Sequence, residues 1–145
     1  MTDNPIWQKY VQWSPARALI ELIHNRKEIP DFPGFYAFNE DVGTLKPGSV
    51  LYIGETDTTG GLRSRLSPYL TPNPKMVVPK HKGGVLICHY RSEVKSDHEI
   101  FLRWAPLEID KEERREIEAA LIQFYTPLFN TRDREAFTSY DVGDQ

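Results

Sequence analysis

A chain of 145 residues, 39% of them hydrophobic and 12% aromatic, has the length and composition of one globular domain, which argues against a disordered or fibrous protein. Its single cysteine, Cys88, excludes an internal disulfide framework and a cysteine-based zinc site and suits a reducing compartment. No apolar stretch approaches the length of a membrane span, and the net charge of -3 gives no overall attraction to nucleic acid. We therefore expect a cytoplasmic protein with no membrane partner.

The first predicted element is a helix that begins at Ser14. Pro15 then stands in its first turn, and apolar residues recur at helical spacing between 18 and 23. This helix should end before Pro30. Residues 1–33 are therefore predicted to form an N-terminal helical extension.

A hairpin and a second helix are predicted next. Residues 34–39 (GFYAFN) and 49–54 (SVLYIG) have the composition of strands, and a Lys-Pro-Gly turn signal lies between them. Residues 60–70 then have helical spacing, with an apolar face formed by Leu62, Leu66 and Tyr69.

The middle of the chain contains a long loop and further sheet candidates. Prolines and glycines predict a loop over 71–84, and the run 85–91 (VLICHYR) is apolar on both faces, which predicts a central strand. Residues 99–107 alternate in a way that suits a strand or a short helix, and both remain open. The order of elements indicates an α+β fold, a small sheet with helices packed on it.

The last predicted helix runs from a capping box at Asp110 and Glu113 to Tyr125, before Pro127. Its predicted apolar stripe consists of Ile117, Leu121, Phe124 and Leu128, widened by Ile122 and Tyr125. Glu118 lies within the widened stripe, where an unpaired charge costs several kcal/mol or more. Two explanations stay open: an ion pair with Arg63, Arg65 or Arg103, or a ligand role for Mg²⁺ or Mn²⁺.

Charge is unevenly distributed along the chain. Between Thr58 and Ser92 there is no acidic residue. The basic residues of this window are Arg63, Arg65, Lys75, Lys80, Lys82 and Arg91, with His81 and His89 among them. The window suggests contacts to phosphates, although an ordinary solvated surface has the same composition.

Four motifs in order resemble the GIY-YIG nuclease superfamily, and most closely the nuclease domain of bacterial nucleotide-excision repair. They are GFY at 34–36, YIG at 52–54, an arginine before a leucine in the following helix, and EAALIQFYTPLFN at 118–130. The resemblance covers about residues 33–130. It implies a small antiparallel sheet flanked by helices and cleavage of phosphodiester bonds with one Mg²⁺ or Mn²⁺ ion.

The resemblance also assigns roles to individual residues. It makes Glu118 the metal ligand, Arg65 the arginine that faces the phosphate, with Arg63 in reserve, and Asn130 a closing polar group. Tyr36 is favoured as the base and Tyr52 as its support, although the residues alone do not distinguish them. Backbone at Gly34 and Gly54 would approach the site. Phosphate contacts are predicted for Lys75, Lys80, His81 and Lys82, although a histidine in a loop is more often a plain surface residue.

Two functions therefore compete. The first is a divalent-metal-dependent endonuclease that acts on DNA, or on RNA, with little sequence specificity, in a domain spanning 34–131 and followed by an acidic tail at 132–145. The second is a weak or inactive nucleic-acid-binding or protein-interaction module on the same scaffold. All five site residue types are present, which favours the first. Glu55, which stands where the repair nucleases often have lysine, and the long loops depart from the family pattern and bear on activity more than on fold.

Overall fold

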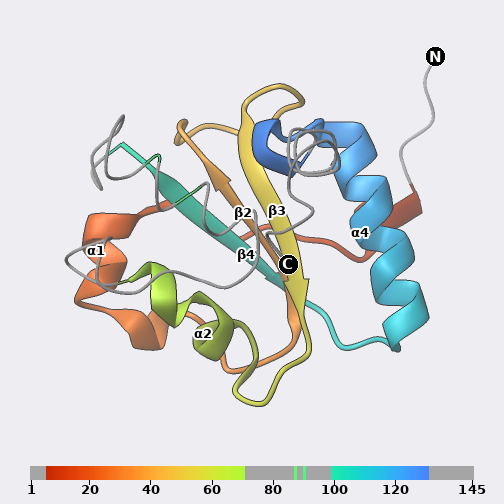
Figure 1. The fold of residues 1–145 in the computed structure, drawn as a ribbon, viewed down its shortest axis with the longest axis horizontal. Helices are drawn as coiled ribbons and strands as arrows, with labels where there is room; N and C mark the ends of the chain where they lie inside the picture. Colours follow the sequence, from red (N-terminus) through yellow and green to blue (C-terminus); the bar gives the residue numbers. More distant parts are fainter. Residues whose placement is uncertain (1–5, 71–86, 88–89, 91–98, 131–145) are drawn as a thin grey trace, which may run out of the picture.

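The computed structural model describes residues 6–70, 87, 90 and 99–130, which form an α+β fold built on one antiparallel sheet (Figure 1). The described elements are η1 (Ile6–Lys9), β1 (Arg17–Ala18), α1 (Leu19–Ile23), η2 (Arg26–Glu28), β2 (Gly34–Asn39), β3 (Val50–Thr56), α2 (Gly61–Leu66), η3 (Ser67–Tyr69), β4 (Phe101–Pro106) and α4 (Lys111–Tyr125). The strands lie in the order β1-β4-β2-β3. The predicted small antiparallel sheet flanked by helices is thus confirmed.

The central strand β2 pairs with β3 on one side and with β4 on the other. The predicted hairpin is β2 and β3, and the segment for which strand and helix were both open is strand β4. In this register Tyr36 lies opposite Gly54 on β3 and opposite Trp104 on β4. A large side chain in the middle of the sheet therefore has a glycine beside it on the edge strand.

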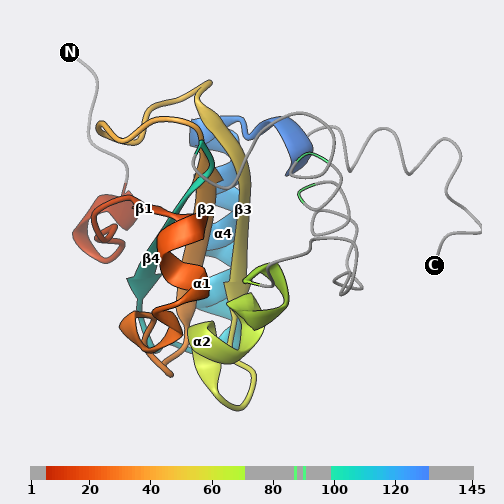
Figure 2. The same cartoon turned by 90° about the vertical axis from the view of Figure 1, so that its left-hand side faces the viewer.

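Helices cover both faces of the sheet. Figure 2 shows α1 and α2 in front of the strands and α4 behind them. The core on the side of α1 and α2 includes Leu19, Leu22, Tyr36, Phe38, Leu62, Leu66 and Tyr69, so the predicted apolar face of the second helix is confirmed. The core on the side of α4 includes Trp7, Val11, Phe35, Ala37, Ile53, Ala105, Leu121 and Tyr125.

The predicted leading helix is wrong in its start and its length. Ser14 extends the pairing with β4 instead of capping a helix, because its N–H donates to the Trp104 carbonyl at 2.8 Å and its Oγ accepts from the Trp104 N–H at 3.0 Å. Sheet pairing thus overrides local helix propensity until Leu19. Since Leu19, Leu22 and Ile29 are fully buried, the segment packs into the core of the sheet.

The predicted central strand over 85–91 is also corrected. Its described members, Ile87 and Tyr90, are helical, and the described sheet contains no strand from this segment. Ile87 is fully buried on the side of α1 and α2. A short run that is apolar on all sides fits a buried helix as well as a buried strand, and periodicity alone does not separate them.

The predicted bounds of α4 are confirmed, but its apolar stripe is shorter than expected. The Asp110 side chain accepts from the Glu113 N–H at 2.8 Å, which caps the first turn. Thr126 has a left-handed backbone with φ of 45°, so helical periodicity stops at Tyr125. Phe124 and Leu128 are 37% and 41% exposed rather than buried.

No helix in the described ranges has the length and apolar character needed to span a bilayer.

Candidate active site

Predicted site residues from different elements meet on the edge strand β3, around Gly54. A Cβ atom at Gly54 would collide with the phenol of Tyr36, so the tyrosine ring crosses over the glycine. A Cβ atom at Gly34 would meet the backbone of Ala105 and Pro106 on β4. Both glycines, predicted to let backbone approach a substrate, therefore make room for the protein's own atoms.

Arg65, in the last turn of α2, faces the Tyr36 hydroxyl. Its Nε donates to the Tyr36 oxygen at 3.4 Å. Burial raises the pKa of the Tyr36 phenol, the Arg65 guanidinium opposes this rise, and the charges of Glu118 and Glu55 add to it. Tyr52 lies on the same face of the sheet, with its ring centroid 6.2 Å from that of Tyr36. The two predicted tyrosines and Arg65 thus form one group.

Arg63 faces a different part of the molecule. Its Nε donates to the Ile29 carbonyl at 2.8 Å, and its Nη2 donates to the Lys27 carbonyl at 3.4 Å. Both acceptors lie at the end of η2, so Arg63 ties α2 to that turn. Of the two arginines considered, Arg65 is the one beside the tyrosines.

Glu118 reaches the same group from α4. It is partly buried, and burial together with the charge of Glu55 raises its pKa from 4.5 to about 7, against the opposing charges of Arg65, Arg114 and Arg115. No ion pair joins it to the proposed partners: Arg63 bonds the carbonyls named above, and Arg103 bonds Asn39 and the backbone of Asp41 and Gly43. The carboxylate therefore lies near Arg65 without a direct partner among the described residues.

The raised pKa of Glu118 predicts how stability depends on pH. A folded-state pKa above the unfolded value stabilises the fold at low pH, and this stabilisation is lost as pH rises through about 7. Urea unfolding with a chelator should therefore show Glu118→Gln to be more stable than wild type at about pH 8, and the difference should shrink below about pH 7 and vanish only below the ordinary pKa of 4.5. Equal pH slopes for the two proteins would contradict the burial of this charge.

Arg114 is the residue of this region that the sequence reasoning missed. It is only 3% exposed, its Nε bonds Glu55, and its Nη2 donates to Asp57 at 2.7 Å. The negative charge of Glu55, which departs from the family pattern, is thus paired inside the protein. The sequence does contain an indication of its place: Arg114 precedes Glu118 by four residues, so the two side chains lie on the same helix face.

Asn130 is bound to the backbone of the edge strand. Its Oδ1 accepts from the Ile53 N–H at 2.7 Å, and its Nδ2 donates to the Ile53 carbonyl at 2.9 Å. Asn130 is 8% exposed. Asn130 is predicted to be a polar group that closes the site. It bonds the backbone of β3 rather than the two tyrosines.

Removal of this contact should be costly. Asn130→Ala leaves the N–H and the carbonyl of Ile53 without their partners, and we expect the free energy of unfolding to fall by about 2 to 4 kcal/mol. Urea titration followed by circular dichroism measures this change, with the exposed Gln123→Ala as the control. A loss below about 0.5 kcal/mol would show that water replaces the amide without cost.

The remaining predicted contacts, Lys75, Lys80, His81 and Lys82, lie outside the described residues. No group of three or more His, Cys, Asp or Glu side chains that could hold a metal occurs within the described part of the chain. Two carboxylates whose charges act on Tyr36 are those of Glu118 and Glu55. One or two carboxylates, completed by water and phosphate oxygens, suit Mg²⁺, so this donor set fits the predicted ion.

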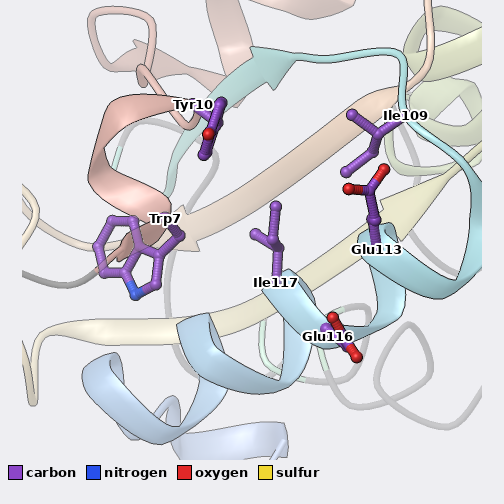
Figure 3. A pocket seen from close by; sticks show the side chains of 6 residues that line it. All are labelled: Trp7, Tyr10, Ile109, Glu113, Glu116 and Ile117. Carbon is purple, nitrogen blue, oxygen red and sulfur yellow. The ribbon is translucent and has the colours of Figure 1, made fainter.

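Two surface pockets lie apart from this group. The first, of about 300 Å³, separates η1 from the first half of α4 and is lined by Trp7, Tyr10, Ile109, Glu113, Glu116 and Ile117 (Figure 3). The second, of about 370 Å³, is lined by residues 23–27. Neither is lined by a predicted site residue.

No protein-family model, no curated protein and no solved structure matches this chain.

Proposed function

We propose that this chain is a divalent-metal-dependent endonuclease that hydrolyses phosphodiester bonds in DNA with little sequence specificity. The observation that supports it best is the meeting of Tyr36, Arg65 and Glu118 around Gly54, where each affects the pKa of another. These residues come from β2, α2 and α4, three elements far apart in the chain. They combine a phenol, a guanidinium and an under-neutralised carboxylate, which are the groups that phosphodiester hydrolysis needs. A cytoplasmic location belongs to the same proposal.

In the proposed reaction Arg65 holds the phosphate. A guanidinium makes paired contacts to two nonbridging oxygens, and these contacts strengthen as negative charge develops. The Tyr36 hydroxyl already accepts from Arg65 Nε, so it keeps the guanidinium in place and lies beside the bound phosphate. Glu118 supplies carboxylate oxygens from α4, and its charge acts on Tyr36.

The attacking water is oriented at the Tyr36 hydroxyl, with Tyr52 packed beside it. Burial keeps the proton on the phenol near neutral pH, so a base role requires its pKa to fall. A bound Mg²⁺ or Mn²⁺ ion would polarise a phosphate oxygen, stabilise the leaving oxygen and offset the Glu118 charge that opposes phenolate formation.

Supercoiled plasmid tests the proposal. The purified chain should produce nicked and linear DNA in Mg²⁺ or Mn²⁺ and nothing in a chelator, and a Glu118→Gln preparation made in parallel controls for contaminating nucleases. Structured and single-stranded RNA are tested in the same buffers. Intact nucleic acid under every condition would overturn the proposal.

One observation favours the second candidate, a module that binds nucleic acid without cutting it. Tyr36 has no exposed surface, and a residue that activates water must be reached by water. Fluorescence anisotropy with labelled duplex DNA separates the two. Salt-dependent binding without cleavage in any divalent ion would support the binding module.

A further inference from the structure

Glu55 lies on the face of β3 that is covered by α4. Arg114 Nε contacts its Oε1. The Arg114 side chain is 4% exposed, that of Glu55 is 22% exposed, and that of Asp57, the other partner of Arg114, is 55% exposed. Glu55 is thus a carboxylate with one oxygen held by a buried cation and a second oxygen for which no bond to a described residue is found.

The path of α4 along β3 brings Glu118 toward this carboxylate. Bonds fix α4 against β3 at both ends. Near the end of β3, Arg114 bonds Glu55 and Asp57. Just before the start of β3, the Gly48 N–H donates to the Tyr125 carbonyl at 3.0 Å. The helix and the strand therefore run antiparallel. Glu118 lies one turn after Arg114 on the same helix face, level with the stretch of β3 around Gly54.

Two carboxylates therefore approach one another at the edge of the sheet, and the nearby arginine is bound to only one of them. Arg114 contacts Glu55 and Asp57 but forms no ion pair with Glu118. Like charges at close range are unfavourable unless a cation or a proton lies between them. Mg²⁺ and Mn²⁺ take such oxygen donors, and Mg²⁺ is commonly held by one or two carboxylates together with substrate phosphates.

We propose that Glu55 is a second carboxylate ligand of the divalent ion, sharing it with Glu118 while Arg114 holds Glu55 in place. This inference rests on the proposed function, because it assumes that Glu118 binds the ion. The site then lies across the edge of the sheet, with Glu55 from β3, Glu118 from α4 and the Arg65–Tyr36 pair on the opposite face at Gly54. A neutral or basic residue at position 55 would leave Glu118 as the only protein ligand.

Binding of Mn²⁺ to the full chain tests this without reference to cleavage. Isothermal titration calorimetry, supported by the electron paramagnetic resonance signal of free Mn²⁺, is carried out on wild type, Glu55→Gln, Asp57→Asn and Glu118→Gln. Asp57→Asn is the matched control, because it removes the same charge and a bond to the same guanidinium two residues farther along. Glu55→Gln should bind Mn²⁺ about tenfold or more weakly, while Asp57→Asn should stay within about threefold of wild type.

The Glu55→Asp variant distinguishes a Glu55 that binds the ion directly from a Glu55 that acts only through its charge. It keeps the charge but withdraws the carboxylate by one methylene, so a ligand role predicts weakened Mn²⁺ binding and a purely electrostatic role predicts unchanged binding. It also serves as the test if Glu55→Gln does not fold, which circular dichroism decides. Equal affinities for wild type and Glu55→Asp, or equal losses in Glu55→Gln and Asp57→Asn, would overturn the inference.

The Glu118 variant distinguishes a failure of the role of Glu55 from a failure of the metal site itself. Loss of Mn²⁺ binding in Glu118→Gln with full binding in the Glu55 variants overturns the role of Glu55 alone. Full binding in Glu118→Gln, or no binding in wild type, overturns the metal site of the proposed function and the role of Glu55 with it.

Discussion

Glu118→Gln should reduce plasmid cleavage in Mg²⁺ by at least about a thousandfold, roughly 4 kcal/mol of activation free energy. The substitution preserves the shape of a partly buried side chain and removes the charge on which metal binding depends. Because that charge is itself unfavourable in the fold, the variant should remain folded and bind Mn²⁺ weakly or not at all. Initial rates of nicking, measured beside circular dichroism spectra, give both results.

Glu116→Gln is the matched control for this change. It removes the same charge from an exposed position on the same helix, two residues earlier. Its cleavage rate should equal that of wild type within about twofold, since surface substitutions away from a site are usually near neutral. A Glu118→Gln protein that cuts as fast as Glu116→Gln would remove Glu118 from the mechanism.

Arg65→Ala should lower the single-turnover cleavage rate at saturating DNA by about 100-fold to 1000-fold. The affinity for DNA should change far less, because the contacts of the guanidinium to phosphate strengthen as charge develops in the transition state. Arg65→Lys should recover little, since an ammonium group cannot make the paired contacts or hold the same position beside Tyr36. Quenched-flow rates and anisotropy titrations on the same preparations separate the two quantities.

Arg63→Ala is the comparison within the same helix. Arg63 bonds the carbonyls of Ile29 and Lys27, so its loss should lower the melting temperature and leave the rate per folded molecule nearly unchanged. If Arg63→Ala slows chemistry more than Arg65→Ala does, the roles assigned to the two arginines must be exchanged.

Local sequence patterns predicted the elements that depend on neighbouring residues in the chain. The β2–β3 hairpin, the buried face of α2 and the bounds of α4 follow from alternation, helical spacing and the Asp110 cap. Ordered motifs identified Tyr36, Arg65 and Glu118, and the structure brings these three together. That they cut DNA stays a prediction.

The features that local patterns did not predict depend on contacts between residues far apart in the chain. Ser14 has the sequence context of a helix cap but bonds Trp104, which lies 90 residues away in the chain. Arg114 lies among charged residues that read as a solvated helix face, and only the packing of α4 on β3 shows that it is buried with Glu55 and Asp57. Asn130 likewise has its partner, Ile53, on another element.

The contact between Asn130 and Ile53 has a consequence for self-association. A strand with one unpaired side presents N–H and carbonyl groups to which a second chain can add, and β3 lies at one margin of the sheet that the described residues form. The Asn130 amide occupies both outward groups of Ile53 in the middle of β3, as a single residue of a neighbouring strand would. The opposite margin of the sheet is β1, whose length of 2 residues offers little to extend. Among the described residues, addition of a strand is thus opposed at Ile53 of β3 by the Asn130 amide and at β1 by the shortness of that strand.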